Sequence, residues 1–173
     1  MDEFGNNLQK TTEYILNICK SPEKGLPEDV FLMISALIPI ANVDLFVMND
    51  NEEILLVWRD DKYFGKGWSI PGGCMRFGET LEDRVHKTAL SEIGQDVFII
   101  EGPITAIDVI RGANFLLKFP NMRGHNITIP FFCKLSNCIQ PNKNLKWFSQ
   151  IPKDILEVHL VYGDLFKKLN LMN

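Results

Sequence analysis

The chain has 173 residues, of which 46% are hydrophobic and 23% are charged, and its formal net charge is −4. These proportions are those of an average soluble globular protein, so they exclude a fibrous or largely disordered chain. The length corresponds to one domain of ordinary size, whose core is large enough to be stable without disulfide bonds. The mild acidity disfavours a nucleic-acid-binding protein with a broad basic surface, but it does not disfavour a protein that binds a nucleotide.

Cysteine usage and the first residues favour a reduced, cytoplasmic protein. The four cysteines form no Cys-x-x-Cys pair and have no spacing typical of a zinc site. The N-terminus is polar and acidic, unlike a signal peptide. The longest apolar run, 30–41, is interrupted by Pro39 and is shorter than the roughly 18 residues that a membrane span requires. We therefore expect a soluble cytoplasmic protein that does not bind membranes.

The first forty residues predict a helical extension. Apolar residues within 8–20 recur at helical spacing, which indicates an amphipathic helix. Residues 21–27 form a turn rich in proline and glycine, after which proline and two acids begin a second helix over 28–38. We assign residues 1–40 to this extension and residues 41–173 to a single domain.

The rest of the chain predicts an α+β domain. Five apolar segments read as strands: 42–48, 53–58, 97–100, 104–110 and 126–135. Residues 59–69 read as a loop, and a capping box at Thr80 and Asp83 begins a helix that Gly94 ends. The tail, 151–171, has apolar residues at helical spacing. No repeat or linker divides the chain.

The informative segment is 72–97. Gly73, Glu79, Glu92 and Gly94 have the spacing of the signature G-x5-E-x7-R-E-U-x-E-E-x-G-U, in which U is a bulky aliphatic residue. The chain therefore resembles the Nudix hydrolase family. This resemblance implies an α/β fold, an α/β/α sandwich with a mixed central sheet, here preceded by the helical extension.

The signature is incomplete in its metal-binding half. Residues 88, 91 and 92 share one helical face because they are spaced i, i+3 and i+4. Three carboxylates there would form an oxygen cage for Mg²⁺, but Thr88 and Ser91 replace two of them. Glu92 is the remaining carboxylate. We expect a single Mg²⁺, bound by Glu92, the Gly73 carbonyl and the pyrophosphate of the substrate.

The pattern of losses resembles the GDP-mannose mannosyl hydrolase branch of the family, which also keeps the final glutamate and lacks the other two. Residues 38–73 resemble the segment that precedes the signature in this branch. The resemblance implies a nucleotide-sugar substrate, water attack at the anomeric carbon, release of a nucleoside diphosphate, and a homodimer. Two alternatives stay open: a pyrophosphohydrolase that cleaves a P–O bond in a nucleoside diphosphate derivative, and a non-catalytic nucleotide-sugar-binding module.

The resemblance also assigns roles to residues around the signature. Arg59 is expected to contact the diphosphate during catalysis, with an exposed arginine as the ordinary alternative. Asp44, an acid inside an apolar strand, is expected to contact the sugar or the nucleotide, or else to be paired within the sheet. Glu79 and Lys87 are expected to form an ion pair. This pair would connect the loop that begins at Gly72 and Gly73, called the glycine loop below, to the helix that follows it. Lysine lacks the bidentate fork of the family's arginine, so this support is weaker.

The general base is the least defined residue. The mannosyl branch takes a histidine from the loop before the late tryptophan, but residues 141–146 contain neither histidine nor carboxylate. His125, just before the strand 126–135, is the candidate, with a structural role as the alternative. Arg111 and Arg123 lie in a long loop or hairpin, which either binds the substrate or forms a dimer contact.

Overall fold

Two β-sheets form the centre of the molecule, which a computed structural model describes for residues 3–110, 125–139 and 142–172. The strands are β1 Ile40–Val47, β2 Ile54–Asp61, β3 Gly65–Ser69, β4 Gly72–Cys74, β5 Val97–Glu101, β6 Ile107–Val109, β7 Asn126–Leu135 and β8 Leu145–Phe148. The larger sheet has the order β4-β1-β7-β5, and β6 also pairs with β7. It is mixed, because β1 and β7 run parallel while the other pairs are antiparallel. The smaller sheet, β3-β2-β8, is antiparallel.

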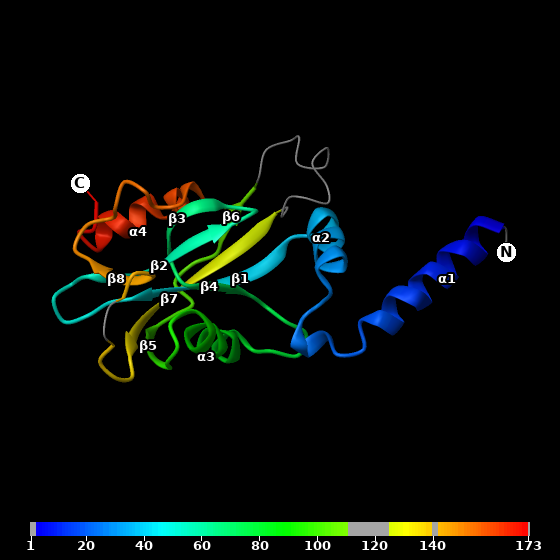
Figure 1. Ribbon diagram of the computed structural model, residues 1–173, viewed down its shortest axis with the longest axis horizontal. Coiled ribbons are helices and arrows are strands. Elements are labelled where there is room, and N and C mark those ends of the chain that lie inside the picture. The colour runs from blue at the N-terminus through cyan, green and yellow to red at the C-terminus, as the bar shows by residue number, and fades with distance from the viewer. Residues whose placement is uncertain (1–2, 111–124, 140–141, 173) are drawn as a thin grey trace.

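Helices cover both faces of this centre. The described α-helices are α1 Glu3–Ile18, α2 Glu28–Leu37, α3 Leu81–Glu92 and α4 Gly163–Lys168, of which α3 and α4 lie over the sheets, and 3₁₀ helices span Pro22–Lys24 and Glu157–Tyr162. Figure 1 shows α3 on one side of the strands and α4 on the other. This arrangement is the α/β/α sandwich with a mixed sheet that the sequence predicted.

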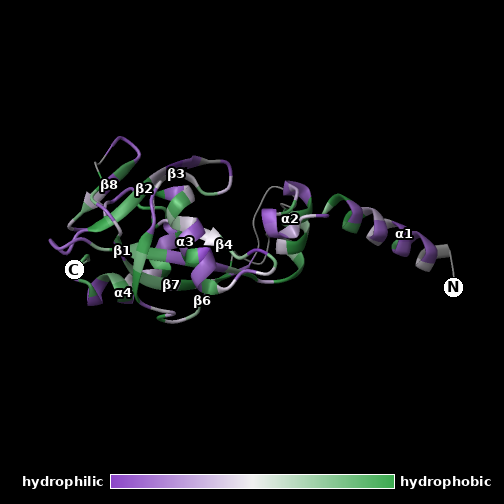
Figure 2. Cartoon of the chain, turned by 90° about the horizontal axis from the view of Figure 1, so that it is seen from below, coloured by the Kyte–Doolittle hydropathy of each residue, from purple (hydrophilic) through white to green (hydrophobic). Residues whose placement is uncertain are grey.

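Strand β1 explains why the core has two halves. Successive side chains of a strand point to opposite faces, so Val43 and Leu45 pack in the half that contains α3. Phe46 packs in the other half, against Tyr162 and Phe166 of the C-terminal helices. Both faces of β1 are therefore buried, which requires a continuous apolar run rather than an alternating pattern. The hydrophobic character of β1 and β7 is visible in Figure 2.

The prediction of a loop over 59–69 was wrong, because most of this segment belongs to the β2–β3 hairpin. The rings of Trp58 and Trp68, which are paired across the two strands, pack edge to face with 5.3 Å between their centroids. A Cβ atom on Gly67 would lie 2.5 Å from the carbonyl oxygen of Asp154. Gly67 thus permits close contact between two backbone segments.

The tail is less helical than predicted. The segment 151–171 was expected to be helical, but only the 3₁₀ helix and α4 within it are, and the segment 104–110 contributes only the short strand β6. In a 3₁₀ helix, residues three apart lie on the same side. His159 and Tyr162 consequently both face inward, and both are buried.

The N-terminal extension begins with α1, which projects away from the sheets (Figure 1). Its side chains Leu8, Tyr14 and Leu16 are exposed. The homodimer that the sequence suggested stays a prediction. None of the helices in the described ranges is both long enough and apolar enough to cross a membrane.

Candidate active site

The two ends of α3 are well defined, and they determine which of its side chains face the candidate site. The Thr80 hydroxyl accepts a hydrogen bond from the backbone N–H of Asp83, and the Asp83 carboxylate accepts one from the backbone N–H of Thr80, which is the predicted capping box. At the other end, Gly94 has a φ of +87° and its N–H bonds to the carbonyl of Ala89. A glycine in this conformation stops a helix at little cost.

Glu79 joins the glycine loop to α3 through a buried carboxylate. Its Oε1 atom lies 3.0 Å from Nζ of Lys87, and its Oε2 atom accepts the backbone N–H of Arg76 at 2.9 Å. Burial acts to raise the pKa of Glu79, but the bonds from Lys87 and Arg76 and the charge of Arg84 together hold it below its usual value. Sequence reasoning missed Arg84, although its spacing of three residues from Lys87 places both cations on one helical face.

The face of α3 that carries the signature contains one carboxylate and two hydroxyls. Thr88 is buried, and its Oγ1 atom has no hydrogen-bond partner among the described residues. A Cβ atom on Gly73 would lie 2.4 Å from that hydroxyl oxygen, so Gly73 permits the loop to rest directly on the helix. The Ser91 hydroxyl donates to the Thr88 carbonyl at 3.1 Å. Glu92 is therefore the acidic group that this face presents.

Arg59 connects Glu92 with the other half of the site. Its Nη2 atom donates to Oε2 of Glu92 at 2.5 Å, and its Nε atom donates to Oγ of Ser69 at 3.1 Å. The two side chains of the ion pair are only 29% and 26% exposed. Arg59 lines both an inner cavity and an outer cleft, so its guanidinium lies where the two meet.

The inner cavity, of about 90 Å³, is polar at its base. Asp44 is buried there and accepts hydrogen bonds from Oγ1 of Thr128 at 2.6 Å, from Nδ2 of Asn42 at 2.9 Å, and from the Tyr162 hydroxyl. Burial, reinforced by the charge of Asp44, raises the pKa of Tyr162 above its usual value. The tyrosine therefore keeps its proton and remains a donor. Asp44 was anticipated from the sequence, but its three partners were not.

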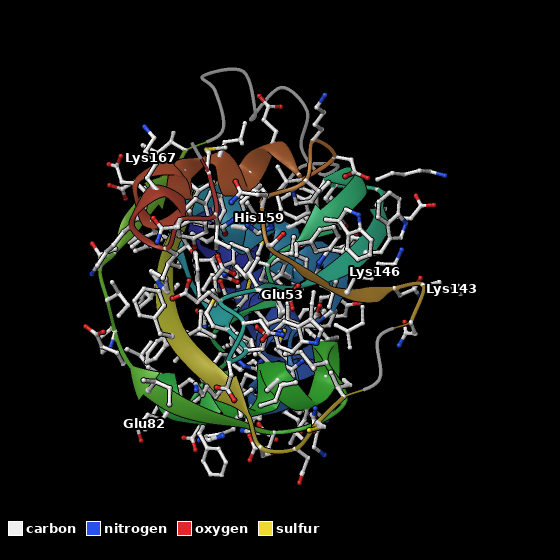
Figure 3. The ribbon with its side chains drawn as sticks, turned by 90° about the vertical axis from the view of Figure 1, so that its left-hand side faces the viewer. Glu53, Glu82, Lys143, Lys146, His159 and Lys167 are labelled. Carbon is white, nitrogen blue, oxygen red and sulfur yellow. The ribbon has the colours of Figure 1, made fainter. Side chains whose placement is uncertain are left out.

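His159 also lines the inner cavity, and sequence reasoning did not consider it. Its Nε2 atom lies 2.9 Å from the Ser69 hydroxyl that receives the bond from Arg59. Burial lowers the pKa of His159 to about 4, although the nearby Asp44 opposes this shift. The ring is thus neutral at pH 7. Figure 3 shows His159 in the interior beneath the C-terminal segment, whereas Lys143 and Lys167 lie at the periphery. The sequence did contain one indication of this burial, because His159 lies within an apolar segment of the tail.

Stability in acid is expected to depend on His159. Its pKa is about 4 in the folded chain and 6.5 in the unfolded one, so between these values only the unfolded chain binds the proton. The free energy of unfolding therefore falls as the pH falls from about 6.5 to 4, by up to roughly 3 kcal/mol. Urea denaturation across this range should show that His159→Gln removes most of the slope. His86→Gln, at a partly exposed ring, should retain it; equal slopes in both variants would contradict the assignment.

One predicted residue, His125, lies away from the two cavities, and two others lie outside the described residues. His125 lies 3.0 Å from Oδ1 of Asp108, and its side chain is not among those that line the two cavities. Its role as a general base stays a prediction. Arg111 and Arg123 lie outside the described residues.

The oxygen donors near Glu92 fit one metal ion better than a cluster. No three acidic, histidine or cysteine side chains come together as a metal site within the described part of the chain. Glu92 supplies one carboxylate, and the unpartnered Thr88 hydroxyl lies against Gly73. This donor set suits a single hard divalent ion that takes its other ligands from substrate oxygens and water, as Mg²⁺ commonly does.

Comparison with known proteins finds a matching family model and a curated relative. The NUDIX domain family model matches residues 39–158. The low-salt glycan biosynthesis protein Agl8 of Haloferax volcanii is 32% identical over 83 residues, which are 48% of this chain and 53% of that protein. The chain thus spans about half the length of this curated relative.

Solved structures show the same fold at low sequence identity. One is described as a possible asymmetric diadenosine tetraphosphate hydrolase from Jonesia denitrificans. It has a TM-score of 0.62 at 14% identity, over 80% of this chain and 99% of that chain. A NUDIX hydrolase from Nitrosomonas europaea has a TM-score of 0.56 at 21% identity, over 76% and 70% of the respective chains. Likeness at these identities supports the fold alone.

Proposed function

Since this chain belongs to the Nudix family, we propose that it hydrolyses a nucleotide-sugar and releases a nucleoside diphosphate and the free sugar. Enzymes of this family act on nucleoside diphosphate derivatives and generally use divalent metal ions. The observation that carries the proposal is the cavity beside the glycine loop, whose base is formed by the buried side chains of Asp44, Thr128 and Tyr162.

This cavity has the chemistry that a sugar requires. Sugar hydroxyls both donate and accept hydrogen bonds, so a sugar site needs acceptors and donors side by side. The hydroxyl oxygens of Thr128 and Tyr162, whose protons point to Asp44, keep lone pairs that can accept, and the Arg59 guanidinium, which also lines this cavity, supplies donors. The similarity to a glycan biosynthesis protein supports a sugar-containing substrate.

The junction of the two cavities has the chemistry that a diphosphate requires. The Arg59 guanidinium can form paired hydrogen bonds with phosphate oxygens, and Ser69, bonded in turn to His159, positions it. Glu92 and the Gly73 carbonyl would hold Mg²⁺, which when bound supplies positive charge beside the departing diphosphate. The Arg59–Glu92 ion pair indicates that both groups reach this point. In this proposal the inner cavity holds the sugar and the junction holds the diphosphate.

A panel of GDP-, UDP-, ADP- and dTDP-sugars with Mg²⁺ tests the proposal. Chromatography of the products should show a free sugar and a nucleoside diphosphate from at least one member. A sugar phosphate and a nucleoside monophosphate would instead indicate a pyrophosphohydrolase. Tight binding with an affinity that does not depend on Mg²⁺, together with no turnover of any member, would indicate a non-catalytic binding module. The loss of two carboxylates at Thr88 and Ser91 is the observation that favours this last outcome.

A further inference from the structure

The N-terminal extension forms one wall of the outer cleft. This cleft, of about 650 Å³, shares Arg59, Gly72 and Gly73 with the inner cavity. Apart from Tyr63 of the β2–β3 hairpin, its remaining walls come from two parts of the chain that are far apart in sequence. One is the turn before α2 together with α2 itself, represented by Leu26 and Phe31, and the other is the loop after β4 together with α3. Figure 1 shows that loop reaching the segment between α1 and α2.

Contacts on two sides hold the extension beside this cleft. The backbone of Gly25 packs on Arg76, since a Cβ atom on Gly25 would lie 3.6 Å from Cζ of that arginine. On the other side, Glu28 pairs with Lys62 at 2.9 Å and accepts a hydrogen bond from the Tyr63 hydroxyl. The turn before α2 is thus fixed between the loop after β4 and the β2–β3 hairpin.

The outer cleft offers a surface for a flat, partly apolar group. Phe77 lines it and is 74% exposed, although an aromatic ring of this size is usually covered. Arg76 lies next to Phe77 in the loop, is exposed, and forms no ion pair with any described residue. Leu26 and Phe31 supply apolar surface on the opposite wall. Aromatic rings and guanidinium groups stack on nucleobases, whatever the base.

We propose that the outer cleft binds the nucleoside of the substrate, with Phe77 stacking on the base and the extension closing the other side. The inference rests on the proposed function, because it continues the same substrate outward from the sugar and the diphosphate. Arg59 lies at the junction, so a diphosphate bound there has the inner cavity, with Asp44 at its base, on one side and the wider cleft that Phe77 lines on the other. The extension then takes part in substrate recognition.

Binding measurements test this subsite without requiring turnover. Isothermal titration with ADP, GDP, UDP and CDP, in the presence of Mg²⁺, is compared with titration of inorganic pyrophosphate. At least one nucleoside diphosphate should bind the intact chain about 10-fold or more tightly than pyrophosphate, because base stacking adds to the phosphate contacts. Equal affinity for pyrophosphate and for all four nucleotides would overturn the proposal, even if a nucleotide-sugar is hydrolysed.

Matched variants locate the subsite. Phe77→Ala should weaken the binding of the best nucleoside diphosphate roughly 10-fold and leave pyrophosphate unchanged, while Phe77→Trp should retain both affinities. Phe98→Ala is the control, since Phe98 is 61% exposed on β5 and lines neither cavity. An equal loss for nucleotide and pyrophosphate in Phe77→Ala, or the same loss in Phe98→Ala, would count against a stacking role.

A second pair of variants tests whether the N-terminal extension forms a wall of the nucleoside site. Leu26→Ser should weaken nucleoside diphosphate binding selectively, since it removes apolar surface from the cleft. Leu37→Ser, at a leucine that is 74% exposed at the end of α2, should not. If both leucine variants bind like the unaltered chain, the extension is not part of the site.

Discussion

Replacing Glu92 with glutamine is expected to lower kcat/KM for nucleotide-sugar hydrolysis by about 100-fold or more. Glu92 is the one carboxylate on the signature face of α3, so the change removes the negative charge that would attract Mg²⁺. Changes to groups that merely support a metal ligand already cost about 10- to 100-fold, and a direct ligand should cost at least as much. Steady-state kinetics over a range of Mg²⁺ concentrations would measure the loss.

The matched control is Glu82→Gln. Glu82 is exposed in the first turn of the same helix and lies at the periphery in Figure 3. Its charge contributes only to the helix terminus, so activity should remain close to that of the unaltered enzyme. If Glu92→Gln retains the same activity and the same Mg²⁺ dependence as Glu82→Gln, Glu92 does not hold the metal.

Replacing Asp44 with asparagine is expected to lower the free energy of unfolding by about 3 kcal/mol and to raise KM for the substrate. The buried Asp44 carboxylate accepts hydrogen bonds from Thr128, Asn42 and Tyr162. Hydrogen bonds to charged groups are worth about 1.5–3 kcal/mol each, and an asparagine NH₂ group would face a donor on at least one side. Urea denaturation gives the stability change, and kinetics with the best substrate gives the change in KM.

Asp60→Asn provides the comparison for Asp44→Asn. Asp60 lies in β2 and pairs with Lys66, but both side chains are more than half exposed. Exposed ion pairs contribute about 1 kcal/mol or less, so this variant should be nearly neutral in stability and in KM. Equal stability of the two variants would mean that the polar base of the inner cavity is not the tightly bonded cluster described above.

The parts of the site that depend on local spacing were predictable from the sequence. The register of α3 follows from its capping box and from Gly94, and this register places Thr88 and Glu92 on the face that meets Gly73. Glu79 and Lys87 follow from the same spacing. These features need no knowledge of how distant segments pack, because each is a property of one loop and one helix.

The parts that depend on long-range packing were not predictable. Asp44 and Tyr162 are separated by 118 positions, and they meet because the C-terminal 3₁₀ helix folds back over the larger sheet. Thr128 reaches Asp44 through the parallel pairing of β1 with β7. His159 faces inward because its segment forms a 3₁₀ turn, whereas the sequence suggested a longer helix.

Hydrolysis in ¹⁸O-labelled water, followed by mass spectrometry of both products, distinguishes water attack at the anomeric carbon from attack at phosphorus. The proposed placement of the sugar in the cavity beside Asp44 makes the diphosphate the leaving group at Arg59. It therefore predicts that the label enters the sugar and that the nucleoside diphosphate remains unlabelled. Label in a phosphate product would show attack at phosphorus and would contradict this placement of the sugar.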